Sequence, residues 1–337
     1  MPSLDILAND AFKPIPLTRA ARRLPYQPQY LGGLNLFEVD RVRTDRVALR
    51  RLNGKISLIP TTERGGDPVI GQSDEGAEAY LRTPRLAKRQ RKQAHELQNL
   101  RSFENPDEFV AVQDEITRIQ TSQRQDMELT HEFHRLGAIQ GKLIDADGTS
   151  VLANFYTLFG VAEPALIDFE LDDAATDVRG KCVAVVRQMR TKAMGAILPS
   201  TRIYAMAGDN FFDALVAHPK VVDTYRYQEG ARLRENTAFT TLEFGGITWV
   251  NYRGTDDGST VAINTDQARF FPVGAPGVFG VVYSPFEAEE FVNTPGEDIY
   301  SIIVRDQERG FWFQPEIYSY PLHYCTMPEL LLRAKKF

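Results

Sequence analysis

Cysteine is scarce in this chain of 337 residues, which contains only Cys182 and Cys325. A disulfide-rich scaffold is therefore excluded, and so are zinc ribbons and Cys-x-x-Cys redox motifs, which need closely spaced cysteines. No apolar run approaches the length of about 20 residues that crosses a bilayer, and the N-terminus lacks the basic start of a secretory signal. We expect a soluble chain that is made in a reducing cytosol and has no membrane partner.

Catalytic motifs are also missing. The chain has no Gly-x-Ser-x-Gly elbow, and Arg64-Gly65-Gly66 lacks the lysine of a phosphate-binding loop. Glu128 and His131 match one half of a di-iron site, but there is no second Glu-x-x-His pair. His131 and His134 are one residue too close for the zinc-protease pattern. We interpret these side chains as polar decoration of a helix and expect no metal or cofactor; an enzyme using the Glu128/His131/His134 face stays open as an alternative.

Charge is unevenly distributed along the chain. The formal net charge is −6, from 39 Lys and Arg against 45 Asp and Glu. Residues 1–101 carry 18 basic and 11 acidic side chains, whereas residues 102–337 carry 21 and 34. The densest basic cluster contains no acid and consists of Arg82, Arg85, Lys88, Arg89, Arg91 and Lys92. A solvated face explains the cluster without any function; the alternative is a segment that lies on nucleic acid or on another subunit.

The first hundred residues read as two extended segments. In residues 1–45, scattered apolar residues and the prolines Pro14, Pro16, Pro25 and Pro28 predict an extended arm that is ordered by the surface on which it docks. Asn53-Gly54 predicts a tight turn in a hairpin over residues 46–60. The polar composition beyond this turn indicates that residues 46–104 form one long excursion that buries little, and such segments are usually functional.

A long helix follows over residues 105–141. Asn105-Pro106 is a favourable helix start, and we expect Gly137 and Gly141 to end the helix. About 30–35 residues at 1.5 Å each give a length of roughly 50 Å. Both ends carry apolar residues at helical spacing, whereas the stretch 120–126 is entirely polar. We interpret the element as a strut with two apolar ends and a solvated middle.

The remainder alternates between helices and strands. Turn signals and apolar spacing predict an α+β fold. The expected helices are 172–195 and a pair within 210–227 that is broken near Pro219. The expected strands and hairpins are 143–152, 202–206, 238–252, 261–271, 300–304 and 311–320.

Short segments distributed over most of the chain carry a family resemblance. They are Leu24-Pro25-Tyr26, Leu31-Gly32 and Leu36-Phe37, then Asn53–Pro60 with Arg64-Gly65-Gly66, then Phe244–Ile247 with Tyr252-Arg253-Gly254, then Phe270–Gly274 and Pro328–Arg333. In order and spacing, these segments resemble the lambda-type major capsid proteins of tailed bacteriophages, which share the Hong Kong 97 fold.

The resemblance implies a division of the chain into the parts of that fold. It places an N-terminal arm at 1–45, an extended loop at 46–104 and a spine helix at 105–141. The spine and the residues up to 172 form the first part of a peripheral domain, and 272–337 form its second part. Residues 173–271 form an axial domain. These boundaries coincide with those suggested by the sequence pattern.

The resemblance also implies a function. The chain would self-assemble into pentamers and hexamers of an icosahedral virion shell that encloses double-stranded DNA, after assembly in the host cytoplasm. Its partners would be further copies of itself, a portal, a scaffold, possible decoration proteins, and packaged DNA contacted without sequence specificity. We expect the basic cluster and Arg64-Gly65-Gly66 to lie at subunit interfaces. An encapsulin-like nanocompartment is the alternative with a similar fold.

Overall fold

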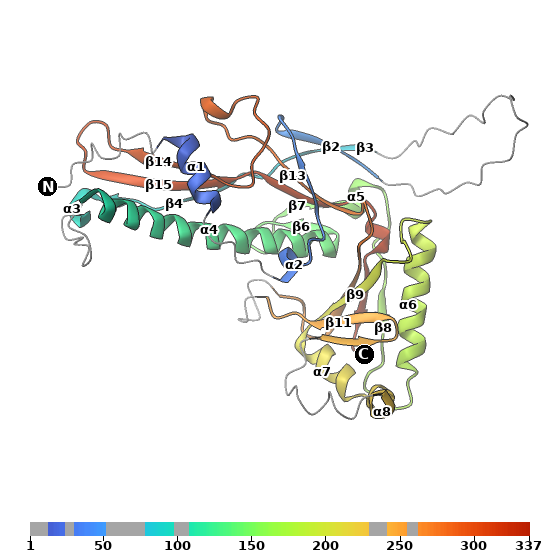
Figure 1. The fold of residues 1–337 in the computed structure, drawn as a ribbon. Coiled ribbons are helices and arrows are strands. Elements are labelled where there is room, and N and C mark those ends of the chain that lie inside the picture. The colour runs from blue at the N-terminus through green and yellow to red at the C-terminus, as the bar shows by residue number, and fades with distance from the viewer. Residues whose placement is uncertain (1–12, 24–29, 52–77, 98–107, 229–240, 255–261) are drawn as a thin grey trace, which may run out of the picture.

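The computed structural model describes residues 13–23, 30–51, 78–97, 108–228, 241–254 and 262–337. These residues form two units that meet at an angle (Figure 1). One unit is elongated and follows a single long helix, with strands running alongside it. The other unit is built on a six-stranded sheet with helices packed against it. The α+β class expected from the sequence is confirmed.

The long helix, α4, spans Glu108–Gln140. Its 33 residues correspond to roughly 50 Å, as predicted. Gly141 ends the helix with a φ of 79°, a left-handed conformation that glycine adopts without steric cost. Gly137 does not end the helix, contrary to our expectation. A Cβ there would lie 2.8 Å from the carbonyl oxygen of Lys142, so glycine allows the following strand to turn back against the helix.

The elongated unit contains two sheets beside α4. In the first, the order is β14–β15–β4, with β5 also paired to β15. In the second, β1 is parallel to β13, and β13 is antiparallel to β16. The strands are β1 (Glu38–Arg41), β4 (Leu86–Arg89), β5 (Lys92–Gln93), β13 (Phe279–Tyr283), β14 (Tyr300–Arg305), β15 (Trp312–Ser319) and β16 (Pro321–Cys325).

Two small antiparallel pairs complete this unit. β6 (Lys142–Ile144) and β7 (Val151–Asn154) form the predicted hairpin with an Asp-Gly turn, and short α5 (Phe155–Leu158) follows. β2 (Arg46–Arg50) pairs with β3 (Glu78–Arg82). The predicted partner of β2, around residues 56–58, lies outside the described residues, as do Asn53 and Gly54.

The second unit is organised around the sheet β10–β11–β9–β12–β17–β8. One face of this sheet packs against α6 and α7 around the fully buried Trp249, whose ring is stacked on that of Phe211. The predicted break at Pro219 is confirmed, because α8 begins there. The strands are β8 (Leu166–Asp168), β9 (Arg202–Ala207), β10 (Thr241–Phe244), β11 (Ile247–Asn251), β12 (Gln267–Val273) and β17 (Leu332–Lys335). The helices are α6 (Val178–Ala193), α7 (Asp209–Ala217), α8 (Pro219–Gln228) and the short η5 (Pro328–Leu330). The short helix η4 (Glu289–Phe291) belongs to the elongated unit.

The N-terminal segment is more regular than its prolines indicated. Residues Pro14–Arg23 form helix α1, and Tyr30–Gly33 form the single turn α2. Pro14 and Pro16 both lie in the first turn of α1, where the backbone N–H groups have no partner within the helix. The first intrahelical bond runs from the Leu17 N–H to the Lys13 carbonyl at 3.0 Å. The expectation of an extended chain is therefore wrong for this part of the arm.

The segment 46–104 is also more embedded than expected. Val47 and Leu49 of β2 are buried in the main core. Further along, β4 and β5 pair with β15 and extend a sheet of the elongated unit. The sequence did not reveal this pairing because β15 lies more than 200 positions away in the chain. Only a long-range partner makes this polar stretch a strand.

Candidate subunit interface and its buried polar support

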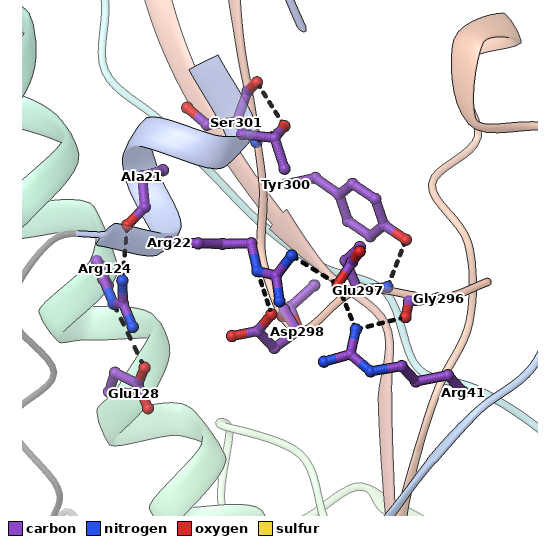
Figure 2. Close-up of polar contacts among 12 residues, drawn as sticks. Ala21, Arg22, Arg41, Arg124, Glu128, Gly296, Glu297, Asp298, Tyr300 and Ser301 are labelled. Atoms are coloured by element: carbon purple, nitrogen blue, oxygen red, sulfur yellow. Dashed lines mark hydrogen bonds and ion pairs between the residues drawn. The ribbon is translucent and has the colours of Figure 1, made fainter. Parts of the chain in front are cut away.

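Helix α1 is held against the elongated unit by polar contacts on two sides (Figure 2). On one side, the Thr18 hydroxyl donates to the Ser301 carbonyl at 3.2 Å and accepts from the Ser301 N–H at 3.1 Å. On the other, a guanidinium nitrogen of Arg124 donates to the Ala21 carbonyl at 2.6 Å. Arg22 forms ion pairs of 2.9 Å with both Glu297 and Asp298. The arm is therefore fixed to both α4 and β14.

One face of the middle of α4 is buried, which corrects the expectation of a fully solvated middle; Ser122 and Gln125 on the other face are exposed. Gln120 donates to the Ser301 hydroxyl at 2.9 Å, and Gln123 donates to the Pro315 carbonyl at 2.9 Å. Both side chains are almost fully buried. Arg124 is buried as well and lies 3.6 Å from Glu128. The buried polar residues of this stretch thus bind the arm, β14 and β15.

Glu132 joins three parts of the molecule. Its carboxylate accepts the backbone N–H groups of Leu31 at 2.7 Å and Gly32 at 3.1 Å, both from α2. The hydroxyl of Tyr252, just after β11, donates to it at 3.4 Å, and Arg135 lies at the same distance. Burial raises the pKa of Glu132, while the two N–H donors and Arg135 act in the opposite direction. The arm, the spine helix and the six-stranded unit meet at this carboxylate.

Three histidines form a buried cluster at the junction of α4 and β16. The ring of His323 lies 5.8 Å from that of His131 and 6.1 Å from that of His134. His131 contacts the Ser319 hydroxyl at 3.1 Å, but neither ring nitrogen of His134 or His323 has a hydrogen-bond partner among the described residues. Burial lowers the pKa of His134 to about 4 and lowers those of the other two strongly. All three imidazoles are therefore neutral at physiological pH.

This cluster corrects the interpretation of Glu128, His131 and His134 as polar decoration. All three side chains are buried, and His131 and His134 are enclosed by packing against β16. Glu128 forms an ion pair with Arg124. Within the described ranges, no group of three or more His, Cys, Asp or Glu side chains is arranged to hold a metal ion.

Both cysteines are buried in apolar surroundings. Burial raises the pKa of the Cys182 thiol to about 12 and raises that of Cys325 as well. A thiolate is the nucleophilic form of cysteine, and these thiols stay protonated at neutral pH. Their role is packing: a Cβ at Gly245 would lie 2.4 Å from the Cβ of Cys182.

The basic cluster expected at an interface lies along β3, β4 and β5, where most of its members have partners in the same chain. Arg82 lies 3.0 Å from Asp45, and Arg85 lies 3.5 Å from Glu287. Lys88 pairs with Asp126 of α4. The guanidinium of Arg91 lies over the Trp312 ring, 4.2 Å from its centroid. Lys92 forms ion pairs with Glu96 at 3.2 Å and Glu115 at 3.6 Å. Arg89 is exposed on β4. Arg64, Gly65 and Gly66 lie outside the described residues.

A second basic surface was missed in the sequence. Helix α6 contains five basic residues and no acidic one. Its basic residues are separated by apolar ones, so they do not form the dense run that identified the first cluster. A count over the predicted helix 172–195 also includes Asp172, Asp173 and Asp177, so the acid-free stretch is evident only once the helix is known to begin at Val178.

Comparison with known proteins decides the family. The sequence profile of the family described as phage major capsid protein E matches residues 16–336. The chain belongs to this family. Major capsid proteins build the phage head, so the chain is a structural protein of the virion shell, and the resemblance to lambda-type capsid proteins is confirmed.

Within the described part of the chain, no helix is long and apolar enough to cross a membrane.

Individual relatives agree with the family match. The chain is similar to the major capsid protein of Salmonella phage Felix O1, with 29% identity over 63% of this chain and 65% of that protein. It is also similar to the major capsid protein of Pseudomonas phage KPP10, with 24% identity over 90% of both chains. The first alignment thus spans just under two thirds of that relative's length.

A solved structure supports the Hong Kong 97 fold. It is a prophage protein of Escherichia coli CFT073 described as a capsid protein, and it matches with a TM-score of 0.59 at 14% identity. The match covers 95% of this chain and 98% of that one. The family match over residues 16–336, and not the fold, favours a phage shell over an encapsulin-like nanocompartment.

Proposed function

We propose that the chain assembles into pentamers and hexamers of an icosahedral shell around double-stranded DNA, and that it has no catalytic role. The observation that carries this proposal is the family match over residues 16–336. The burial of the histidines and cysteines supports the absence of catalysis, because a buried, protonated thiol cannot attack a substrate. A portal, a scaffold and decoration proteins are the further partners that such a shell would need.

We further propose that the chain is divided as the resemblance implies. Residues 1–45 are the arm, 46–104 the extended loop, and 105–172 with 272–337 the peripheral domain. Residues 173–271 are the axial domain. The separation of the elongated unit from the six-stranded unit supports this division (Figure 1), although β17 and β8 of that sheet come from segments assigned to the peripheral domain.

The segment between β2 and β3 is proposed to contact a neighbouring subunit. Arg50, the last residue of β2, is paired in register with Glu78, the first residue of β3. The two ends of the segment that joins these strands therefore lie side by side. Val47 and Leu49 anchor this base in the core. Because Arg50 and Glu78 already lie opposite each other, a short link can replace the residues between them without moving either strand.

An excision variant tests the proposed function. Residues 52–77 are replaced by Gly-Asn-Gly, which keeps β2, β3 and Arg51. Negative-stain electron microscopy of the wild type should reveal closed shells, and the variant should form none. Its melting transition should stay cooperative and close to that of the wild type. A matched variant replaces the exposed turn Gln307–Arg309 by Gly-Asn-Gly and should still form shells. Loss of cooperative melting in the excision variant would assign the segment to the subunit core and contradict the proposal.

A further inference from the structure

Helix α6 presents an outward face that is basic and lacks any acidic side chain. Arg179, Arg187 and Arg190 are all exposed. At 100° per residue they fall within one arc of roughly 80°, and they span about 16 Å along the helix axis. The opposite side of the helix, which includes Cys182 and Met189, is fully buried against the sheet. The helix is thus firmly held with its three arginines directed away from the core.

These arginines are not neutralised within the chain. Among the described residues, no ion pair joins Arg179, Arg187 or Arg190 to an acid, whereas Lys181 on the flank of the helix is paired with Glu170 at 2.8 Å. The nearest acid in sequence, Asp177, caps the helix by accepting the Gly180 N–H at 2.9 Å. This distinguishes α6 from the β3–β5 cluster, in which Arg82, Arg85, Lys88 and Lys92 are paired with acids of the same chain.

The rest of the outward face indicates the kind of partner. Val183, half-buried, lies at the centre of the arc that holds the arginines, and Gly180, Ala184, Gln188 and Thr191, all exposed, lie along one flank of that arc. The core of a protein–protein interface is enriched in aromatic side chains as well as arginine, and α6 contains no aromatic residue. Arginine, glutamine and threonine are among the side chains that contact phosphate oxygens, and the small residues Gly180 and Ala184 beside the arginines leave room for a backbone to approach.

We propose that the outward face of α6 binds the phosphate backbone of double-stranded DNA, without sequence specificity. This proposal rests on the proposed function, since it makes the enclosed genome the partner and directs this face toward the interior of the shell. Each subunit would contribute about three phosphate contacts. Such contacts are weak individually but are repeated on every subunit of a shell.

The test compares DNA binding by two full-length variants. One carries Arg179→Gln, Arg187→Gln and Arg190→Gln, and the control carries Arg82→Gln, Arg85→Gln and Lys88→Gln. Fluorescence anisotropy with a short labelled DNA duplex of mixed sequence is measured over a series of salt concentrations. Each neutralised phosphate contributes about 0.9 to the slope of log affinity against log salt. The α6 variant should lower the magnitude of this slope by about 3, and the control should leave the slope unchanged.

Shell assembly provides the second readout. The α6 variant should still form closed, empty shells under the electron microscope. An unchanged salt slope would overturn the proposal. So would a failure of the variant to form empty shells, because α6 would then contact a second copy of the chain. If the wild type itself formed no shells, the proposed function would fail, while the salt slopes would still decide whether α6 binds DNA.

Discussion

The carboxylate of Glu132 lies 2.7 Å from the backbone nitrogen of Leu31, across 101 positions of sequence. It is almost fully buried and accepts from the arm while it also contacts Tyr252 beside the six-stranded sheet. A buried carboxylate with several donors fixes the relative positions of the groups that donate to it. This contact explains why the arm, the spine helix and the second unit keep one arrangement.

Replacing this carboxylate should destabilise the subunit. In Glu132→Gln, one side-chain atom becomes an NH₂ donor that faces the N–H of Leu31 or Gly32. We expect a loss of about 2–4 kcal/mol in the free energy of unfolding, because a buried N–H loses its acceptor. Urea unfolding measures this loss. The control Glu308→Gln, on an exposed turn, should change stability by less than about 0.5 kcal/mol. Equal effects of the two variants would contradict the role of Glu132.

The histidine cluster predicts a loss of stability in acid. Its pKa values are lowered in the folded state, to about 4 for His134, against about 6.5 in the unfolded chain. Above pH 6.5 both states are neutral and the cluster has no effect. As the pH falls below 6.5, the unfolded state binds protons that the folded state does not, so stability decreases by about 1.4 kcal/mol per pH unit for each histidine. For His134 this continues to about pH 4.

The surroundings of the cluster support this sign. Arg135 lowers the pKa of His131 and His323 further, and Asp145 raises that of His134 only in part. The variant His134→Leu should match the wild type at pH 7.5 within about 1 kcal/mol, since its imidazole makes no hydrogen bond. Between pH 6 and pH 5 its unfolding free energy should fall less steeply, by about 1.4 kcal/mol per pH unit. The exposed control His95→Gln should keep the wild-type slope.

Local signals in the sequence predicted much of the fold. The length of α4, the break at Pro219 and the hairpin at Gly148 each depend on residues close in the chain, such as glycines, prolines and apolar spacing. Helix α1 was missed because Pro14 and Pro16 were taken as breakers, whereas a first turn tolerates both. The domain boundaries stay a prediction.

The polar interior could not be predicted in the same way. Gln123, Glu132 and His131 resemble surface residues of a helix, and their partners lie between about 100 and 190 positions away. A single sequence reveals which side chains are polar but not which long-range segment satisfies them. For the same reason, the charge of the β3–β5 cluster was visible whereas its neutralisation by Asp45, Asp126 and Glu287 was not.

The β3–β5 cluster still supports a prediction about assembly. Changing Arg85, Lys88, Arg89 and Arg91 together to Gln should slow or block shell formation, if the cluster lies on the acidic body of a neighbouring subunit. The melting temperature of the isolated subunit should change little, because exposed ion pairs each contribute about 0–1 kcal/mol. Light scattering during assembly measures the rate. Normal formation of empty shells by this variant would contradict the interface, and poor packaging or retention of the genome in those shells would then favour contact between the cluster and nucleic acid.

The buried pair Arg124–Glu128 leads to a prediction about what holds helix α1 of the arm against α4. In Arg124→Leu, the Ala21 carbonyl loses its donor and the buried Glu128 loses its ion-pair partner. We expect a loss of about 3–5 kcal/mol and faster cleavage by trypsin between α1 and α2. The double variant Arg124→Leu/Glu128→Leu removes the uncompensated charge and should regain most of the stability, because two apolar side chains can replace a buried pair at little cost. It should still release the arm, since the Ala21 carbonyl stays without its donor. If the double variant were cleaved as slowly as the wild type, the contact between Arg124 and Ala21 would not be what holds α1 to the spine helix.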